Sequence, residues 1–125
     1  MTELDHTLVR DAVAAFYDHL SAGRFGECYR LLDPAVTEQP MGQDLASYCR
    51  NLAAYRAALT LPLRVERTEL TLGGPPTVLY GDRDFAHGRT IVRDAAGNRR
   101  TYQERWVKND GLWYTRCVGY LAESD

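Results

Sequence analysis

The residue types that most often do chemistry are few in this sequence, and their spacing matches no strong motif. Cys28, Cys49 and Cys117 are odd in number and lack CxxC spacing, so neither a zinc site nor a disulfide framework is expected. Cys28 and Cys49 fall on apolar helix faces, where reduced thiols behave as small hydrophobic groups. No Ser-His-Asp or Cys-His set and no phosphate-cradling glycine loop can be assembled, so we expect no metal and no cofactor.

The charged residues are unusual in kind rather than in number. Fifteen basic residues face seventeen acidic ones, for a net charge of -2, and every basic residue except Lys108 is Arg. A balance of this kind argues against nucleic acid or an anionic membrane as a partner, because binding to either relies on dense positive charge. Codon bias in a GC-rich genome explains the arginines. The alternative is that some are kept for their planar donor fork.

The first half of the chain has helical periodicity. Apolar residues from Leu4 to Leu20 form one stripe that Gly23 ends, and two shorter helices follow at 25–32 and 45–59. Between them, residues 35–42 are expected to be irregular. No secretory signal and no membrane-length apolar run is present, so we expect a cytoplasmic protein.

After Pro62 the apolar period becomes two. Strands are predicted at 63–72, 77–80, 85–93, 99–107 and 112–121, and a slip of phase inside the first indicates a bulge. Helices followed by a meander predict one α+β domain over 1–125, with the helices on one face of an antiparallel sheet.

The two hairpins allow a prediction of strand register. The first loop pairs Val92 with Thr101 and the second pairs Val107 with Leu112, so alternation divides the side chains between two faces. One face carries Ala86, Gly88, Thr90, Gln103, Arg105, Val107, Leu112, Tyr114, Arg116, Val118 and Tyr120. The other carries His87, Arg89, Ile91, Tyr102, Glu104, Trp106, Trp113, Thr115 and Cys117. A slip of one residue would exchange the faces.

Two segments carry a resemblance to a known family. FYDHLSAGRFGECYRLLDP near the start and QERWVKNDGLWYTRC near the end resemble the NTF2-like superfamily, and most of all its SnoaL-like and ketosteroid-isomerase-like branch. The resemblance covers nearly the whole chain. It implies a cystatin-like cone, in which a curved sheet wraps a long helix and leaves a pocket at the wide end, and it implies dimers in many members. It does not fix an activity.

The resemblance also implies which face lines the pocket. It places the first face inward, with Gln103, Arg116, Val118 and Tyr120 at matching positions. The other face, with Tyr102, Trp106 and Trp113, would then be outward and apolar, which favours a homodimer through the sheet. An alternative is that one Trp fills the core. In the same register, Arg89 opposite Glu104 would form a cross-strand ion pair.

The catalytic positions of a ketosteroid isomerase are changed. Gln39 stands at the position of the base, Phe16 at that of the helix tyrosine, and Gln103 at that of the second acid. An amide cannot accept a proton at neutral pH, so the resemblance does not extend to the classical isomerase reaction. The segment 82–84, Asp-Arg-Asp, is similar to the carboxylate–Arg arrangement of epoxide-hydrolase relatives, but it suits a turn better.

What remains is a polar candidate pocket without a base. The ligand-binding candidates are Phe16, Gln39, Gln103, Arg105, Tyr114, Arg116 and Tyr120. Two inward Arg could hold a polar or anionic small molecule, with or without a cyclase, isomerase or dehydratase type of reaction by orientation and carbonyl polarisation. They could equally pair with Glu inside the protein or reach solvent at the mouth. The alternative function is a non-catalytic, dimeric protein-interaction module.

Overall fold

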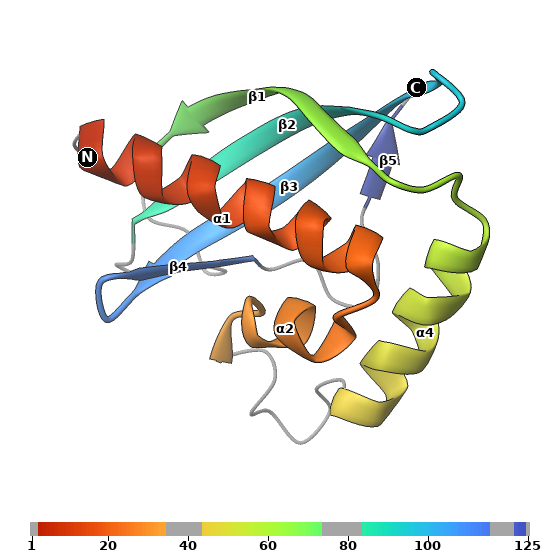
Figure 1. Cartoon of the computed structure of the whole chain (residues 1–125). Coiled ribbons are helices and arrows are strands. Elements are labelled where there is room, and N and C mark those ends of the chain that lie inside the picture. Colours follow the sequence, from red (N-terminus) through yellow and green to blue (C-terminus); the bar gives the residue numbers. More distant parts are fainter. Residues whose placement is uncertain (1–2, 35–43, 74–83, 116–121, 125) are drawn as a thin grey trace.

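The computed structural model describes residues 3–34, 44–73, 84–115 and 122–124 (Figure 1). Within these ranges the helices α1 (Glu3–Ala22), α2 (Phe25–Arg30) and α4 (Leu45–Ala57) come first. The strands β1 (Arg64–Leu72), β2 (Phe85–Arg93), β3 (Arg99–Asn109), β4 (Leu112–Thr115) and β5 (Ala122–Ser124) follow. The sheet is antiparallel in the order β1-β2-β3-β4, and β5 also pairs with β3. The predicted α+β class is therefore confirmed, while the predicted strand at 77–80 lies outside the described residues.

The long helix α1 lies across one face of the sheet (Figure 1). Its predicted apolar stripe is the buried one, and Val9, Val13, Phe16 and Leu20 are all shielded from solvent. Burial of each such side chain contributes roughly 1.5–3 kcal/mol, an upper value because the unfolded chain is itself partly compact. The helix ends where predicted, because Gly23 has a φ of +78°, a conformation that suits the residue after a helix.

Helix α4 is held to the end of α1 by hydrogen bonds. The Asp44 carboxylate accepts a bond of 2.7 Å from the Ser47 N–H and so caps the first turn of α4. From its last turn, the Arg56 guanidinium donates to the carbonyls of Leu20 (3.0 Å) and Ser21 (2.8 Å). These carbonyls have no partner inside their own helix, so Arg56 satisfies the C-terminal end of α1.

The first strand contains the predicted bulge. The β1–β2 register shifts between Val65 and Arg67, which leaves Glu66 as the extra residue. The change of apolar phase inside 63–72 therefore has its expected cause, a one-residue insertion in the strand. Arg10 of α1 donates to the Thr68 carbonyl at 2.7 Å and fastens the helix to this strand.

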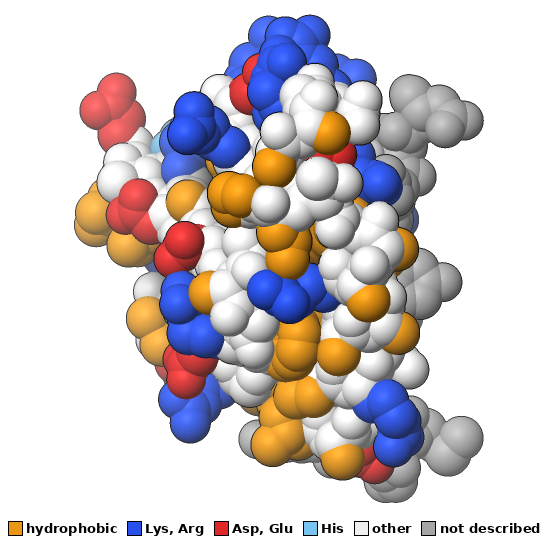
Figure 2. All heavy atoms as spheres, turned by 45° about the vertical axis from the view of Figure 1, so that its right-hand side comes forward, with side chains coloured by type: hydrophobic (Ala, Val, Ile, Leu, Met, Phe, Trp, Pro, Cys, Tyr) orange, Lys and Arg blue, Asp and Glu red, His pale blue; other side chains and the backbone are white. Residues whose placement is uncertain are grey.

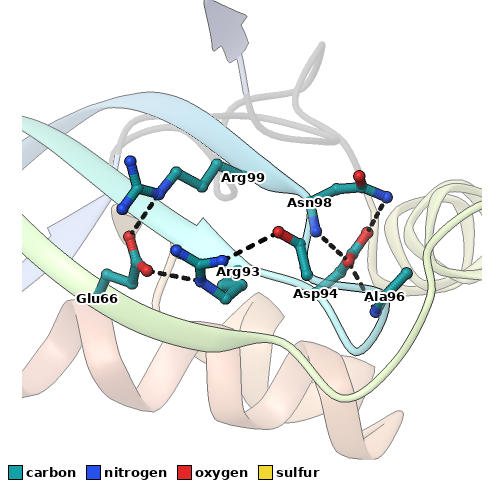
Figure 3. Close-up of polar contacts among 7 residues, drawn as sticks. Glu66, Arg93, Asp94, Ala96, Asn98 and Arg99 are labelled. Atoms are coloured by element: carbon teal, nitrogen blue, oxygen red, sulfur yellow. Dashed lines mark hydrogen bonds and ion pairs between the residues drawn. The ribbon is translucent and has the colours of Figure 1, made fainter.

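The predicted register of the β2–β3 hairpin is wrong by one residue. Val92 pairs with Arg100, not with Thr101. Asp94 sets this phase, because its Oδ1 accepts hydrogen bonds from the N–H groups of Ala96 (3.0 Å) and Asn98 (2.9 Å), as Figure 3 shows. Gly97 completes the turn with a φ of +89°. The result is a three-residue loop, 95–97, with a left-handed residue at its end, and such a loop shifts the pairing by one relative to the expected one.

The β3–β4 hairpin is tighter than predicted. Asn109 pairs with Leu112 across a two-residue turn, in which Asp110 and Gly111 have φ of 51° and 81°. Positive φ at both central residues is the requirement of a type I′ turn, which Asp-Gly meets well. The predicted pairing of Val107 with Leu112 is wrong by two residues. A slip of two keeps the relative faces of β3 and β4, so only the β2–β3 error changes which side chains are inside.

The faces of β3 and β4 are therefore exchanged relative to the prediction. Tyr102, Glu104, Trp106, Trp113 and Thr115 are buried on the face that the helices cover, together with Ala86 and Thr90. Gln103 and Arg105 are exposed on the opposite, outer face, which Tyr114 shares. The predicted Arg89–Glu104 ion pair is also wrong, since Arg89 pairs with Glu69 at 3.7 Å.

The interior is filled largely by aromatic rings. Tyr17 of α1 stacks on Tyr102 of β3 with ring centroids 5.4 Å apart, and the Tyr102 hydroxyl lies 2.7 Å from that of Tyr55 in α4. Trp106 is the largest fully buried side chain. The alternative that a Trp fills the core is the one the structure supports. The aromatic side chains on which the expected sheet-mediated dimer relied lie under the helices.

The N-terminal end of α1 is anchored to the β3–β4 hairpin by one carboxylate. Asp5 is only 5% exposed, and its Oδ1 accepts hydrogen bonds from Lys108 Nζ at 3.0 Å and from the Trp113 indole N–H at 3.3 Å. These contacts join residues more than a hundred positions apart. Asp5 therefore fixes the angle at which the helix crosses the sheet.

We predict that Asp5→Ala lowers the free energy of unfolding by about 2–3 kcal/mol, because it leaves a buried indole N–H and a half-buried ammonium without their acceptor. Urea unfolding followed by tryptophan fluorescence measures the change. The control is Asp11→Ala, an exposed carboxylate on the same helix. Equal losses in the two variants would mean that the Asp5 contacts do not stabilise the fold.

Candidate functional site

The most unusual buried group in the described residues is the carboxyl group of Glu104. Its residue is 3% exposed and lies near the middle of β3, on the face covered by α1. The side chain crosses the sheet toward Gly88, its partner on β2. A Cβ added at Gly88 would lie at an ordinary van der Waals distance of 3.7 Å from Glu104 Oε1, so the carboxyl group packs beside this residue. Buried carboxyl groups are rare unless they are paired or functional.

The hydrogen-bonding groups around Glu104 are few and neutral. Its Oε2 accepts a bond of 3.3 Å from the Trp106 indole N–H, while Oε1 has no hydrogen-bond partner among the described residues. Thr90 and Tyr17 are its other polar neighbours, and Thr90 Oγ1 in turn lies 3.3 Å from Thr68 Oγ1. The cluster thus takes one residue from α1, β1 and β2 and two from β3, and holds no cation that could neutralise the carboxylate.

Burial raises the pKa of Glu104 from its ordinary value of 4.5 to about 7, and the nearby polar groups of Thr90, Trp106 and Tyr17 oppose only part of the rise. The cause is the loss of water around the charged form. A carboxyl group with a pKa near 7 exists in both protonation states at neutral pH. It can donate a hydrogen bond or proton in one state and accept one in the other, which is the requirement of a general acid–base.

A groove reaches the helix side of this cluster. It lies between α1 and the start of β1, has a volume of about 430 Å³, and includes Tyr17 in its wall. The other lining residues are Ala14, Ala15, Asp18, Leu63, Arg64 and Val65. Tyr17 therefore lies both in the wall of the groove and beside the buried carboxyl group.

A second groove of about 320 Å³ lies between α1 and the β3–β4 hairpin, lined by Leu8, Ala12, Arg30, Leu31, Gly111, Leu112, Trp113 and Tyr114. Its rim is apolar, and Leu112 is 60% exposed. In Figure 2 further apolar side chains are spread over the middle of the face that the view presents.

The predicted ligand-binding residues do not come together in one pocket. Phe16 is in the core, packed at the edge of Tyr17, whereas Gln103 and Arg105 are exposed on the other side of the sheet. Tyr114 is half-buried on β4 and lines the second groove. The remaining candidates, Gln39, Arg116 and Tyr120, lie outside the described residues. Phe16 and the Gln103–Arg105 pair therefore cannot hold the same small molecule.

The cysteine predictions have simpler outcomes. Burial raises the pKa of Cys28 to about 12, so this thiol stays protonated, as expected of a structural cysteine. Cys49 is half-buried and also reduced, and Cys117 lies outside the described residues. No three His, Cys, Asp or Glu side chains gather within the described ranges in a way that could hold a metal ion.

The predicted face of Glu104 is wrong, although the sequence contains a signal that indicates the correct one. Tyr102, Glu104 and Trp106 alternate along one strand, so Glu104 shares a face with two large aromatic residues. Aromatic side chains in a sheet that carries helices on one side favour the covered face. The turn residues Asp94 and Gly97 favour the same assignment of β3 side chains to the two faces of the sheet.

Comparisons with known proteins show little. No family model matches the chain, and no solved structure matches it. A segment of 85 residues, 67% of this chain, is 34% identical to part of the probable potassium transport system protein Kup of Rhodococcus jostii (strain RHA1). The match spans only 11% of that protein. In the part of this chain that the structure describes, no helix is long and apolar enough to cross a membrane.

We predict that the free energy of unfolding falls as the pH rises from about 4.5 to 7 and then levels off, by about 3 kcal/mol in total from Glu104. The sign follows from proton binding, because the folded state keeps a proton in this window that the unfolded chain releases. Glu104→Gln removes the decline. Urea unfolding at pH 5, 6, 7 and 8 measures it, with Glu69→Gln as an exposed control in the same sheet. An unchanged decline in Glu104→Gln would assign it to other groups.

Proposed function

We propose that the chain is an NTF2-like pocket protein that binds a small, uncharged polar organic molecule on the helix-covered face of its sheet, with Glu104 as the group that recognises it. The observation that carries the proposal is Glu104 Oε1, a buried oxygen without a hydrogen-bond partner among the described residues. A buried polar atom of this kind costs stability unless something binds it. A ligand hydroxyl or carbonyl group would complete its hydrogen bonding.

The charge of the cluster selects among ligands. An anionic ligand would meet a carboxyl group that is itself half ionised near neutral pH, and Arg105 faces away on the outer side of the sheet. A ketone, enone or hydroxy-ketone avoids the repulsion. Protonated Glu104 can donate to its carbonyl oxygen, and ionised Glu104 can accept from a hydroxyl group. The groove at Tyr17 supports a route from solvent.

The same group supports a reaction of the isomerase or dehydratase type. Such reactions move a proton next to a carbonyl group, and a carboxyl group with a pKa near 7 is suited to both the removal and the return of that proton. The resemblance assigns the base to Gln39, an amide. Glu104 supplies a titratable group that the Gln39 position lacks, from a different element of the fold.

Thermal shift against a panel of uncharged ketones, enones and hydroxy-ketones of graded size tests this proposal. We expect at least one compound to raise the Tm of the wild-type protein, and we expect Glu104→Ala to abolish the shift while Gln103→Ala, the neighbouring outer-face residue, retains it. No shift with any compound, or equal shifts in the three proteins, would contradict ligand binding at Glu104.

A second candidate is a non-catalytic, dimeric interaction module. Two observations favour it: the interior is already filled by Tyr17, Tyr48, Tyr102 and Trp106, and exposed Leu8 and Leu112 border the groove between α1 and the hairpin. The potassium transport protein, in which the matching segment is a small part of a longer chain, is consistent with a module of this size.

Light scattering distinguishes this candidate. The module hypothesis predicts a homodimer that Leu112→Asp dissociates, because burial of a new charge in an apolar contact is unfavourable. The matched control is Leu45→Asp, which changes an equally exposed leucine on α4. A monomer at all concentrations would exclude the homodimer.

A further inference from the structure

The outer face of the sheet carries a regular array of arginines. Strand pairing places Arg67 opposite Ile91, Arg89 opposite Gln103, and His87 opposite Arg105. Arg67, Arg89 and Arg105 therefore follow one diagonal across β1, β2 and β3, in which neighbouring positions are about 7–8 Å apart.

Two further arginines, Arg93 and Arg99, face each other where the β2–β3 hairpin begins. Basic side chains gather at the upper end of the molecule in Figure 2, the end where Figure 1 shows this hairpin.

The acidic residues on this face are too few to neutralise the array. Glu66 is shared by Arg93 (2.7 Å) and Arg99 (3.1 Å), as Figure 3 shows. Glu69 is shared by Arg67 (3.0 Å) and Arg89 (3.7 Å). Arg105 is exposed and has no carboxylate within ion-pair distance among the described residues. Among the described residues, five arginines against two glutamates leave a surplus of three positive charges on this face, although the whole chain has a net charge of -2.

This concentration of charge has a cost in the isolated protein. Like charges on adjacent positions of a sheet repel, and each shared glutamate can offset only one of its two arginines. The side chains of Arg67, Arg89, Arg93 and Arg99 are between 41% and 66% exposed, so a partner can reach them from solvent. An Arg fork matches the two oxygens of a carboxylate, and repeated forks match repeated carboxylates.

The chemistry of the face favours carboxylates over nucleic acid. Three large aromatic residues of β3 and β4, Tyr102, Trp106 and Trp113, are buried on the opposite face and cannot stack on bases, and Tyr114, which shares the outer face, is half-buried. A surplus of three charges is also small beside the six to ten phosphate contacts, in order of magnitude, of a typical nucleic-acid site. Two identical basic faces would repel each other, so a second copy of this face is equally disfavoured.

We propose that the outer face of the sheet, defined by Arg67, Arg89, Arg93, Arg99 and Arg105, docks a carboxylate-rich segment of a partner protein. The segment lies along the Arg67–Arg89–Arg105 diagonal, and Arg105, which lacks an internal partner among the described residues, binds it most directly. This interaction is separate from the Glu104 cluster, because the two lie on opposite faces of the same strands.

Fluorescence anisotropy with the full-length protein tests the proposal. The probes are a labelled peptide of alternating Glu and Ser, its Gln–Ser counterpart, and a single-stranded DNA oligonucleotide of equal charge. We expect the acidic peptide to bind, with a Kd that rises with salt, and the Gln–Ser peptide not to bind. The double variant Arg89→Ser/Arg105→Ser should weaken binding about tenfold or more, since each guanidinium–carboxylate pair is charge-assisted.

The matched control is Arg30→Ser/Arg50→Ser, which removes the same charge from exposed positions on α2 and α4. It should leave the Kd within about twofold, since charge alone is long-ranged and weakly selective. Three results would overturn the proposal: no binding of the acidic peptide at low salt, equal weakening by both double variants, or tighter binding of the oligonucleotide than of the peptide. Circular dichroism confirms that each variant is folded.

Discussion

The hydrogen bonds that the Asp94 carboxylate accepts from the backbone of its own turn decide which side chains lie on each face of the sheet. Its Oδ1 holds the N–H groups of Ala96 and Asn98, and the Asp94 N–H itself donates to the Asn98 carbonyl at 2.9 Å. A strand has a side-chain period of two, so a shift of one residue at this turn would exchange every side chain of β3 between core and solvent. Trp106 would then be exposed and Arg105 buried. The free-energy difference between these two arrangements is large, and both the turn geometry and the burial of the core side chains favour the observed one.

The register places the carboxyl group of Glu104 on the helix-covered face of the sheet and the guanidinium group of Arg105 on the outer face. β3 alternates Tyr102, Glu104 and Trp106 toward the helices with Gln103 and Arg105 toward solvent. The lone carboxyl group of the strand is thereby surrounded by aromatic rings and hydroxyl groups, while the guanidinium groups of three strands share one surface. Burial away from water raises the pKa of Glu104, and no positively charged side chain of the described residues offsets the rise.

Much of the fold could be predicted from the sequence, because local signals determined it. The helix stripe that ends at Gly23, the bulge in 63–72 and the bounds of 85–93 follow from periodicity and turn residues. The site could not be predicted in the same way. The site depends on whether the turn between β2 and β3 contains an odd or an even number of residues. The sequence around 94–98 is compatible with both. The predicted turn has the wrong parity, and it therefore places Glu104 on the outer face of the sheet and Gln103 and Arg105 on the inner face. The family resemblance could not correct this error, because it implies only which of the two predicted faces lines the pocket and not which residues share a face.

The predominance of Arg over Lys can now be considered position by position. Codon bias is the expected cause of the total, and arginines such as Arg30, which pairs with a neighbouring glutamate on the same helix, require no further cause. Arg56 has a structural role, since its fork satisfies two carbonyls at once, which a lysine could do less well. Neither account covers Arg105, which satisfies no described carbonyl or carboxylate and stands beside Gln103 on a face that already has a positive surplus. Since Arg105 adds repulsion there without a partner among the described residues, the contact proposed for it is one outside the chain, on the outer face of the sheet and away from the Glu104 cluster.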